Sequence, residues 1–151
     1  MSSFFQRACA VSIASVLCGG AAAAGNDFPR LKPGEWEFTR KGFEGPPNAQ
    51  SLAVKECIDP VRTMREQNTM LAQAGCRFDP VKVEGNVYTY TAQCDIPDMG
   101  KTRSVSVLTA ESDRAYTVKV ESEGEIKGKP MKASEILTAR RVGNCAVGKA
   151  K

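Results

Sequence analysis

The cysteines constrain the fold of this chain more than any other feature. Six are present, and four of them lie after the N-terminal segment: Cys57, Cys76, Cys94 and Cys145. An even number of cysteines at long spacings is typical of disulfides in an exported domain. A zinc site is disfavoured, because no CxxC pair occurs and the chain has no histidine. We therefore predict two disulfides, no metal and no other cofactor.

A hairpin signal at Gly85-Asn86 indicates how the cysteines pair. Cys76 and Cys94 are equally far from Gly85, so a regular hairpin places them opposite each other, close enough to be bridged. Cys57 then pairs with Cys145. Pro80 favours an edge strand or a bulge that would change this register. Two other pairings therefore stay open: Cys57–Cys76 with Cys94–Cys145, and Cys57–Cys94 with Cys76–Cys145.

The N-terminus has the pattern of a secretory signal. Arg7 precedes an apolar run that ends in Ala22-Ala23-Ala24, which fits the small-x-small site of signal peptidase. We expect residues 1–24 to be removed, with the mature protein in the periplasm or secreted. The apolar run is shorter than the roughly 20 residues of a membrane span, so no span is expected after cleavage. The formal net charge of +4 is too small to indicate nucleic acid as a partner.

The remaining chain is expected to form one β domain, residues 33–145, between a loose lead-in (25–32) and a disordered tail (146–151). Alternating apolar and polar residues predict strands at 35–39, 51–57, 77–84, 87–94, 103–110, 115–122 and 131–142. Gly- and Pro-rich stretches predict loops at 42–50, 95–100 and 123–130. Pairing about the turn at 111–114 sets Val105 opposite Val120 and Val107 opposite Val118, on one apolar face.

A single helix is predicted between the second and third strands. Asp59 is a suitable N-cap, Pro60 suits the first helical position, and Gly75 can end the helix. A narrow apolar stripe follows from four residues at helical spacing: Val61, Met64, Leu71 and Ala74. The expected fold is mainly β, with a single antiparallel sheet of about seven strands, curved or partly closed into a barrel, and one helix. Short turns favour a meander.

These landmarks also resemble a known family. The segment 31–39 (LKPGEWEFT) is similar to the opening PG-x-W-E motif of the exported bacterial family known as domain of unknown function 3617. Cys57-Ile58-Asp59-Pro60, the hairpin that ends at Cys94 and the closing segment 140–145 (RRVGNC) resemble it too. The resemblance covers residues 31–145. It implies an exported, disulfide-containing β domain and assigns no activity or catalytic residue.

Few side chains are candidates for chemistry. Without histidine, the Ser-His-Asp and Cys-His arrangements are absent, and so are histidine metal ligands. Paired carboxylates could act as general acid and base, but strand alternation places them on solvated faces: Glu35 with Glu37, and Glu121 with Glu123. A basic run could bind an anionic surface, although a solvated loop is favoured: Lys127, Lys129 and Lys132. Five aromatic residues could line a pocket or fill the core: Trp36, Phe38, Tyr88, Tyr90 and Tyr116.

The function that fits these observations best is non-catalytic. We expect a periplasmic or secreted domain whose curved sheet holds a small apolar ligand. A disulfide-stapled protein-interaction or inhibitor module, with another exported protein as its partner, stays open as an alternative. A carboxylate-dependent hydrolase is a third and less favoured reading.

Overall fold

The computed structural model describes residues 28–42 and 53–146. The predicted signal peptide, most of the predicted loop 42–50 and the tail from residue 147 onward lie outside these residues. The elements follow the order β1 (Gly34–Lys41), β2 (Val54–Ile58), α1 (Pro60–Gln73), β3 (Cys76–Phe78), β4 (Lys82–Glu84), β5 (Val87–Ile96), β6 (Gly100–Ser112), β7 (Ala115–Ile126) and β8 (Lys129–Gly143).

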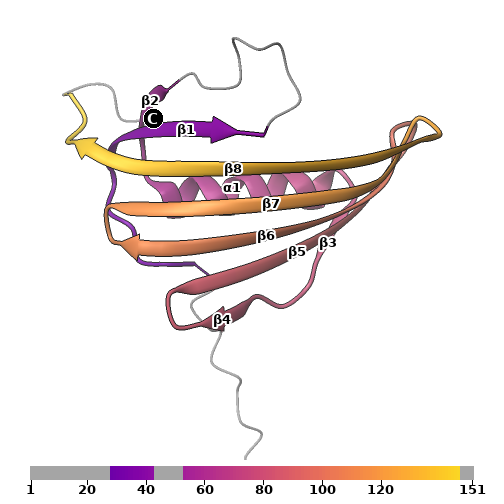
Figure 1. The fold of residues 1–151 in the computed structure, drawn as a ribbon, viewed down its shortest axis with the longest axis horizontal. Coiled ribbons are helices and arrows are strands. Elements are labelled where there is room, and N and C mark those ends of the chain that lie inside the picture. Colours follow the sequence, from indigo (N-terminus) through magenta and orange to yellow (C-terminus); the bar gives the residue numbers. More distant parts are fainter. Residues whose placement is uncertain (1–27, 43–52, 147–151) are drawn as a thin grey trace, which may run out of the picture.

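All the strands belong to one antiparallel sheet, ordered β2-β1-β8-β7-β6-β5-β3, with β4 also paired to β5. The sheet is open and curved, and α1 lies across one of its faces behind β7 and β8 (Figure 1). The strands β5 to β8 form the predicted meander. The first strand, β1, pairs with the last strand, β8, so this pairing joins segments that are far apart in the sequence. The sheet has eight strands rather than about seven, because β3 and β4 are separated around Pro80.

The predicted pairing of β6 with β7 is wrong by one residue. Val105 lies opposite Glu121 and Val107 opposite Lys119, whereas Val120 lies opposite Ser106. The register shifts at a bulge between Ala110 and Ser112. An extra residue in one strand turns the rest of its side chains to the other face. Val105 and Val107 are therefore on the opposite face from their expected partners.

Of two predicted loops, 95–100 is half strand and 123–130 is mostly strand. β5 and β6 are joined by a turn at 97–99, and β7 and β8 by the two-residue turn Lys127-Gly128. Both residues of this second turn have positive φ, 50° and 75°, the geometry of a tight hairpin. Gly124 suggested a loop, yet it lies within β7, where a Cβ would collide with the backbone oxygen of Lys101. Close strand approach, rather than chain flexibility, requires glycine there.

Helix α1 begins and ends as predicted. The Asp59 Oδ1 accepts hydrogen bonds from the backbone N–H groups of Val61 and Arg62, at 3.1 and 3.2 Å. Gly75 follows the helix with φ 107°. Of the predicted stripe, Val61 and Met64 pack against the core, whereas Leu71 is half-buried and Ala74 is exposed. The apolar stripe is thus effective only in the first half of the helix.

Both disulfides flank α1. Cys57, just before the helix, is bonded to Cys145 at the end of β8. Cys76, just after the helix, is bonded to Cys94 of β5, and these two residues are register partners, as the hairpin argument requires. Each end of the helical segment is therefore attached covalently to the sheet.

The core lies where the first turns of α1 meet the sheet, and its buried residues are Leu31, Trp36, Leu108, Tyr116 and Ala139. Leu31 belongs to the predicted lead-in, and it is buried in this core. The Trp36 indole N–H donates to the carbonyl of Lys32 at 3.0 Å, and the Lys32 N–H donates to the carbonyl of Asp113 at 2.8 Å. A buried indole needs an acceptor, which fixes the lead-in here. Within residues 28–42 and 53–146, no helix combines the length and the hydrophobicity that a membrane span requires.

Candidate functional site

A groove of about 580 Å³ lies between α1 and the face of the sheet that α1 covers, which we call the helix-side face. Its volume is within the range of small-molecule sites. Strand residues that alternate toward α1 form its floor, and one side of the helix forms its wall. The residues that line it are Phe28, Phe38, Arg40, Val54, Glu56, Ile58, Pro60, Thr63, Met64, Gln67, Asn68, Phe78, Tyr90, Ala92, Ser106, Leu108, Tyr116, Val118, Val120, Glu135 and Leu137.

The floor of the groove is set by the strand register. One row across the sheet runs from Leu108 through Val118 and Leu137 to Arg40, each opposite the next on neighbouring strands. The next row runs from Tyr90 through Ser106 and Val120 to Glu135. All of these positions face α1. The first row is apolar up to Arg40, whereas the second row contains both apolar and polar side chains.

An aromatic contact from the lead-in lies at the β5 side of the groove. The ring of Phe28 stacks on Tyr90 with 5.9 Å between centroids. The Arg65 guanidinium of α1 lies 5.5 Å from the centroid of the Phe28 ring, within cation–π range. Phe28 therefore links the lead-in to Tyr90 of the groove floor and to Arg65 of α1.

The five predicted aromatic residues divide between core and groove. Trp36 and Tyr116 are 0% and 4% exposed, with ring centroids 5.5 Å apart. Burial raises the pKa of Tyr116 to about 12. Phe38 and Tyr90 line the groove and also pack against the core, whereas Tyr88 only packs against it. Tyr116 is also part of the groove lining, so the core forms the closed end of the groove.

The predicted carboxylates lie on the outer face, which is the face of the sheet opposite α1. Glu35 and Glu37 alternate with Trp36, and Glu37 pairs with Lys55 at 3.8 Å. Glu121 and Glu123 line a depression of about 390 Å³ on the strands β6 to β8. None of these four side chains lines the groove.

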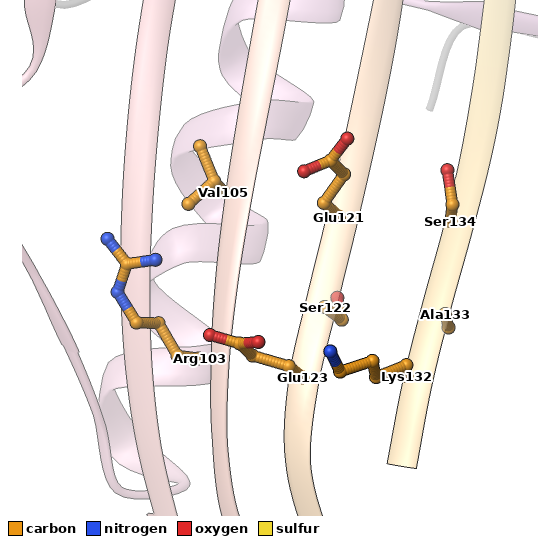
Figure 2. Close-up of a pocket in the computed structure, with 8 residues that line it drawn as sticks. All are labelled: Arg103, Val105, Glu121, Ser122, Glu123, Lys132, Ala133 and Ser134. Carbon is orange, nitrogen blue, oxygen red and sulfur yellow. The ribbon is translucent and has the colours of Figure 1, made fainter.

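Figure 2 shows the outer-face depression with α1 on the far side of the sheet. Arg103, Glu123 and Lys132 are register partners on neighbouring strands and form a row of alternating charge. Such opposite-charge cross-strand neighbours stabilise a sheet modestly. Of the predicted basic run, Lys132 belongs to this row, while Lys127 and Lys129 lie at the β7–β8 turn. The predicted basic run is thus divided between the row and the turn.

Among residues 28–42 and 53–146, no group of three or more His, Cys, Asp or Glu side chains is placed to hold a metal ion.

Several groove residues were not singled out from the sequence, namely Phe28, Arg40, Gln67, Asn68, Ser106 and Glu135. The i, i+2 spacing of Glu135, Leu137 and Ala139 carries a signal, because a buried Ala139 places Glu135 on the same face. Ser106 carries no clear signal, because the bulge at Glu111 shifts the register and so changes which face of the sheet the β6 side chains occupy. Arg40 has the same signal as Glu135, since it follows Trp36 and Phe38 at i, i+2 spacing, whereas Phe28 has none.

Comparison with known proteins places the chain in a family. A model of the family described as "protein of unknown function (DUF3617)" matches residues 31–145. The chain belongs to the DUF3617 family. Its matched region begins at the buried Leu31 and ends at the disulfide-bonded Cys145, so it spans the whole sheet and α1. No curated protein matches the chain. No solved structure matches it either.

Proposed function

We propose that this member of the DUF3617 family is an exported, non-catalytic domain that binds a small, largely apolar molecule in the groove under α1. The observation that supports this most is the groove itself, whose lining is dominated by aliphatic and aromatic side chains. Small-molecule sites are typically concave and apolar with a few placed polar groups.

The exposure of the lining supports the same proposal. Phe78 and Val54 at the groove are 37% and 47% exposed. Covering such side chains with an apolar ligand removes them from water, at roughly 25 cal/mol for each Å² of apolar surface. The ligand therefore replaces solvent rather than core packing.

Two further features support a rigid, exported binder. Disulfides persist in oxidising compartments, and this domain has two. They attach both ends of the helical segment to the sheet, so the groove is preformed. A preformed site loses less conformational entropy when the ligand binds.

The proposal is tested by native mass spectrometry of the mature protein isolated without detergent from the envelope of its own cells. We expect a small molecule bound at one per chain. Ser106→Trp on the groove floor, or Gln67→Trp on the helix wall, should abolish this bound mass. The matched control is Val105→Trp. Val105 is next to Ser106 in β6 but faces the outer side of the sheet, so this variant should retain the bound molecule.

The opposite results would contradict the proposal. A wild-type protein that carries no small molecule, or carries another protein in its place, would favour an interaction module instead. A bound mass that survives both groove variants while they fold normally by circular dichroism would place the ligand elsewhere.

A further inference from the structure

The groove floor changes character along the strands. At the core end, β6 and β7 present Leu108 and Val118, which lie opposite each other. Two residues further along β6, about 7 Å away, Ser106 takes the place of Leu108. On β8 the same step leads from Leu137 to Glu135. On β6 and β8 the floor is thus apolar toward the core and polar away from it, whereas β7 presents a valine in both rows.

The helix wall changes in the same direction. Pro60 is buried, and Met64 packs against the core, whereas Gln67 and Asn68 lie about one turn further along α1, near 5 Å away. The amides of both residues can donate and accept hydrogen bonds. Because Cys76 after α1 is bonded to Cys94 of β5, the polar part of the helix lies toward the polar end of the floor.

Two opposite charges lie on the β8 side of the groove: Glu135 in the polar row, and Arg40 at the end of the row that contains Leu108, Val118 and Leu137. Arg40 is opposite Leu137, so Glu135 is its diagonal neighbour on β8, about 7–8 Å away between Cα atoms. Both side chains line the groove, and neither has a hydrogen bond or an ion pair with any residue that the structure describes. Glu56, the third charged residue of the lining, is exposed on the edge strand β2 opposite Trp36.

From this arrangement we propose that the ligand is an amphiphile with an aliphatic chain and an uncharged head that carries hydroxyl or amide groups. The inference rests on the proposed function of the groove. The chain points toward Leu108 and Val118, and the head lies between Arg40 and Glu135. A hydroxyl or amide donates to the carboxylate and accepts from the guanidinium at once. A carboxylate head accepts from Arg40 but is repelled by Glu135, and a quaternary ammonium head is attracted by Glu135 but has nothing for Arg40 to donate to.

The test compares three probes that share one chain length but differ in the head: monolauroylglycerol, laurate and dodecyltrimethylammonium. Binding to the mature protein is measured by isothermal titration calorimetry below the micelle concentration of each probe. We expect monolauroylglycerol to bind at least about tenfold more tightly than either charged probe, the equivalent of one charge-assisted hydrogen bond. Glu135→Gln should strengthen laurate binding about tenfold, and Arg40→Gln should do the same for dodecyltrimethylammonium.

A charge control separates a local effect from the field of the whole domain. Glu121→Gln changes the same charge on the outer face of the adjacent strand and should leave all three affinities unchanged. Equal affinities for the three heads, or equal effects of Glu135→Gln and Glu121→Gln, would overturn the inference and leave apolar binding intact. Failure of all three probes to bind would also overturn it. The proposed function fails separately, when no small molecule remains with the native protein.

Discussion

The two faces of the sheet consist of the same strands but differ in what covers them. On the helix-side face, Trp36 and Leu108 are 0% and 2% exposed, whereas Ile136 on the outer face is 37% exposed. Ile136 is the direct neighbour of Leu137, which packs against the core. An apolar strand residue is therefore buried only where α1 covers its face. The position of α1 decides which face becomes the core, and the two disulfides fix that position.

The largest expected effect comes from releasing α1 from the helix-side face. In the entropic model, a disulfide across 88 residues stabilises by about 4.5 kcal/mol and one across 18 residues by about 3 kcal/mol. The double variant Cys57→Ala/Cys145→Ala should therefore lose more unfolding free energy than Cys76→Ala/Cys94→Ala. Denaturant titration measures both. A reversed order would mean that the far end of α1, not its start, holds the helix on the sheet.

The next effect contrasts single residues on the two faces. Trp36→Ala should lower the unfolding free energy by about 3–5 kcal/mol, because the indole is fully buried and leaves a cavity. Ile136→Ala on the outer face should cost less than about 1 kcal/mol. Urea unfolding followed by circular dichroism gives both values. Similar losses for the two variants would show that the outer face is also covered in solution.

Alkaline pH offers a smaller and more specific test of the helix-side core. The pKa of Tyr116 is raised by burial from 10.0 to about 12, so its neutral form is favoured in the folded state. Stability from this residue is complete below about pH 10 and is lost as pH rises toward about pH 12, by about 2–3 kcal/mol in total. Tyr116→Phe should unfold with a flatter dependence on pH in this range. An equally steep dependence in the variant would assign the loss to other groups.

The smallest expected effect concerns the start of α1. Asp59→Ala removes the acceptor for the N–H groups of Val61 and Arg62 and should cost about 1 kcal/mol. Asp59→Asn keeps a side-chain oxygen at the cap and should be close to wild type. Thermal unfolding of the three proteins decides this. An Asn variant as unstable as the Ala variant would show that charge, rather than the hydrogen bond, matters at this position.

The sequence predicts which segments form the helix and the strands better than it predicts which face of the sheet each side chain occupies. Asp59, Gly75 and the symmetry of Cys76 and Cys94 about Gly85 are local signals, and local geometry satisfies them. The bulge near Glu111 has no such signal, since nothing in that segment distinguishes an extra residue from a longer turn. That single residue decides which face Val105 and Val107 occupy.

The candidate site was harder to predict than the fold. Trp36 and Phe38 were expected in a core or a pocket, and the structure uses them for the core and the groove. The groove itself depends on how α1 crosses the sheet, which is a tertiary property. Arg40 and Glu135 meet only because β1 pairs with β8, far apart in the chain. A prediction based on local patterns has no access to that pairing.

Binding of an apolar ligand to the helix-side face can be followed residue by residue with methyl NMR. Monolauroylglycerol is titrated into mature protein labelled with ¹³C at the methyl groups of Val, Leu and Ile. We expect chemical-shift changes for the methyl groups of Val118, Val120 and Leu137, which line the groove. We expect none for Val105, Val107 and Ile136, which lie on the outer face of the sheet. Shifts confined to the outer-face methyls, or no shifts at saturating ligand, would contradict this expectation.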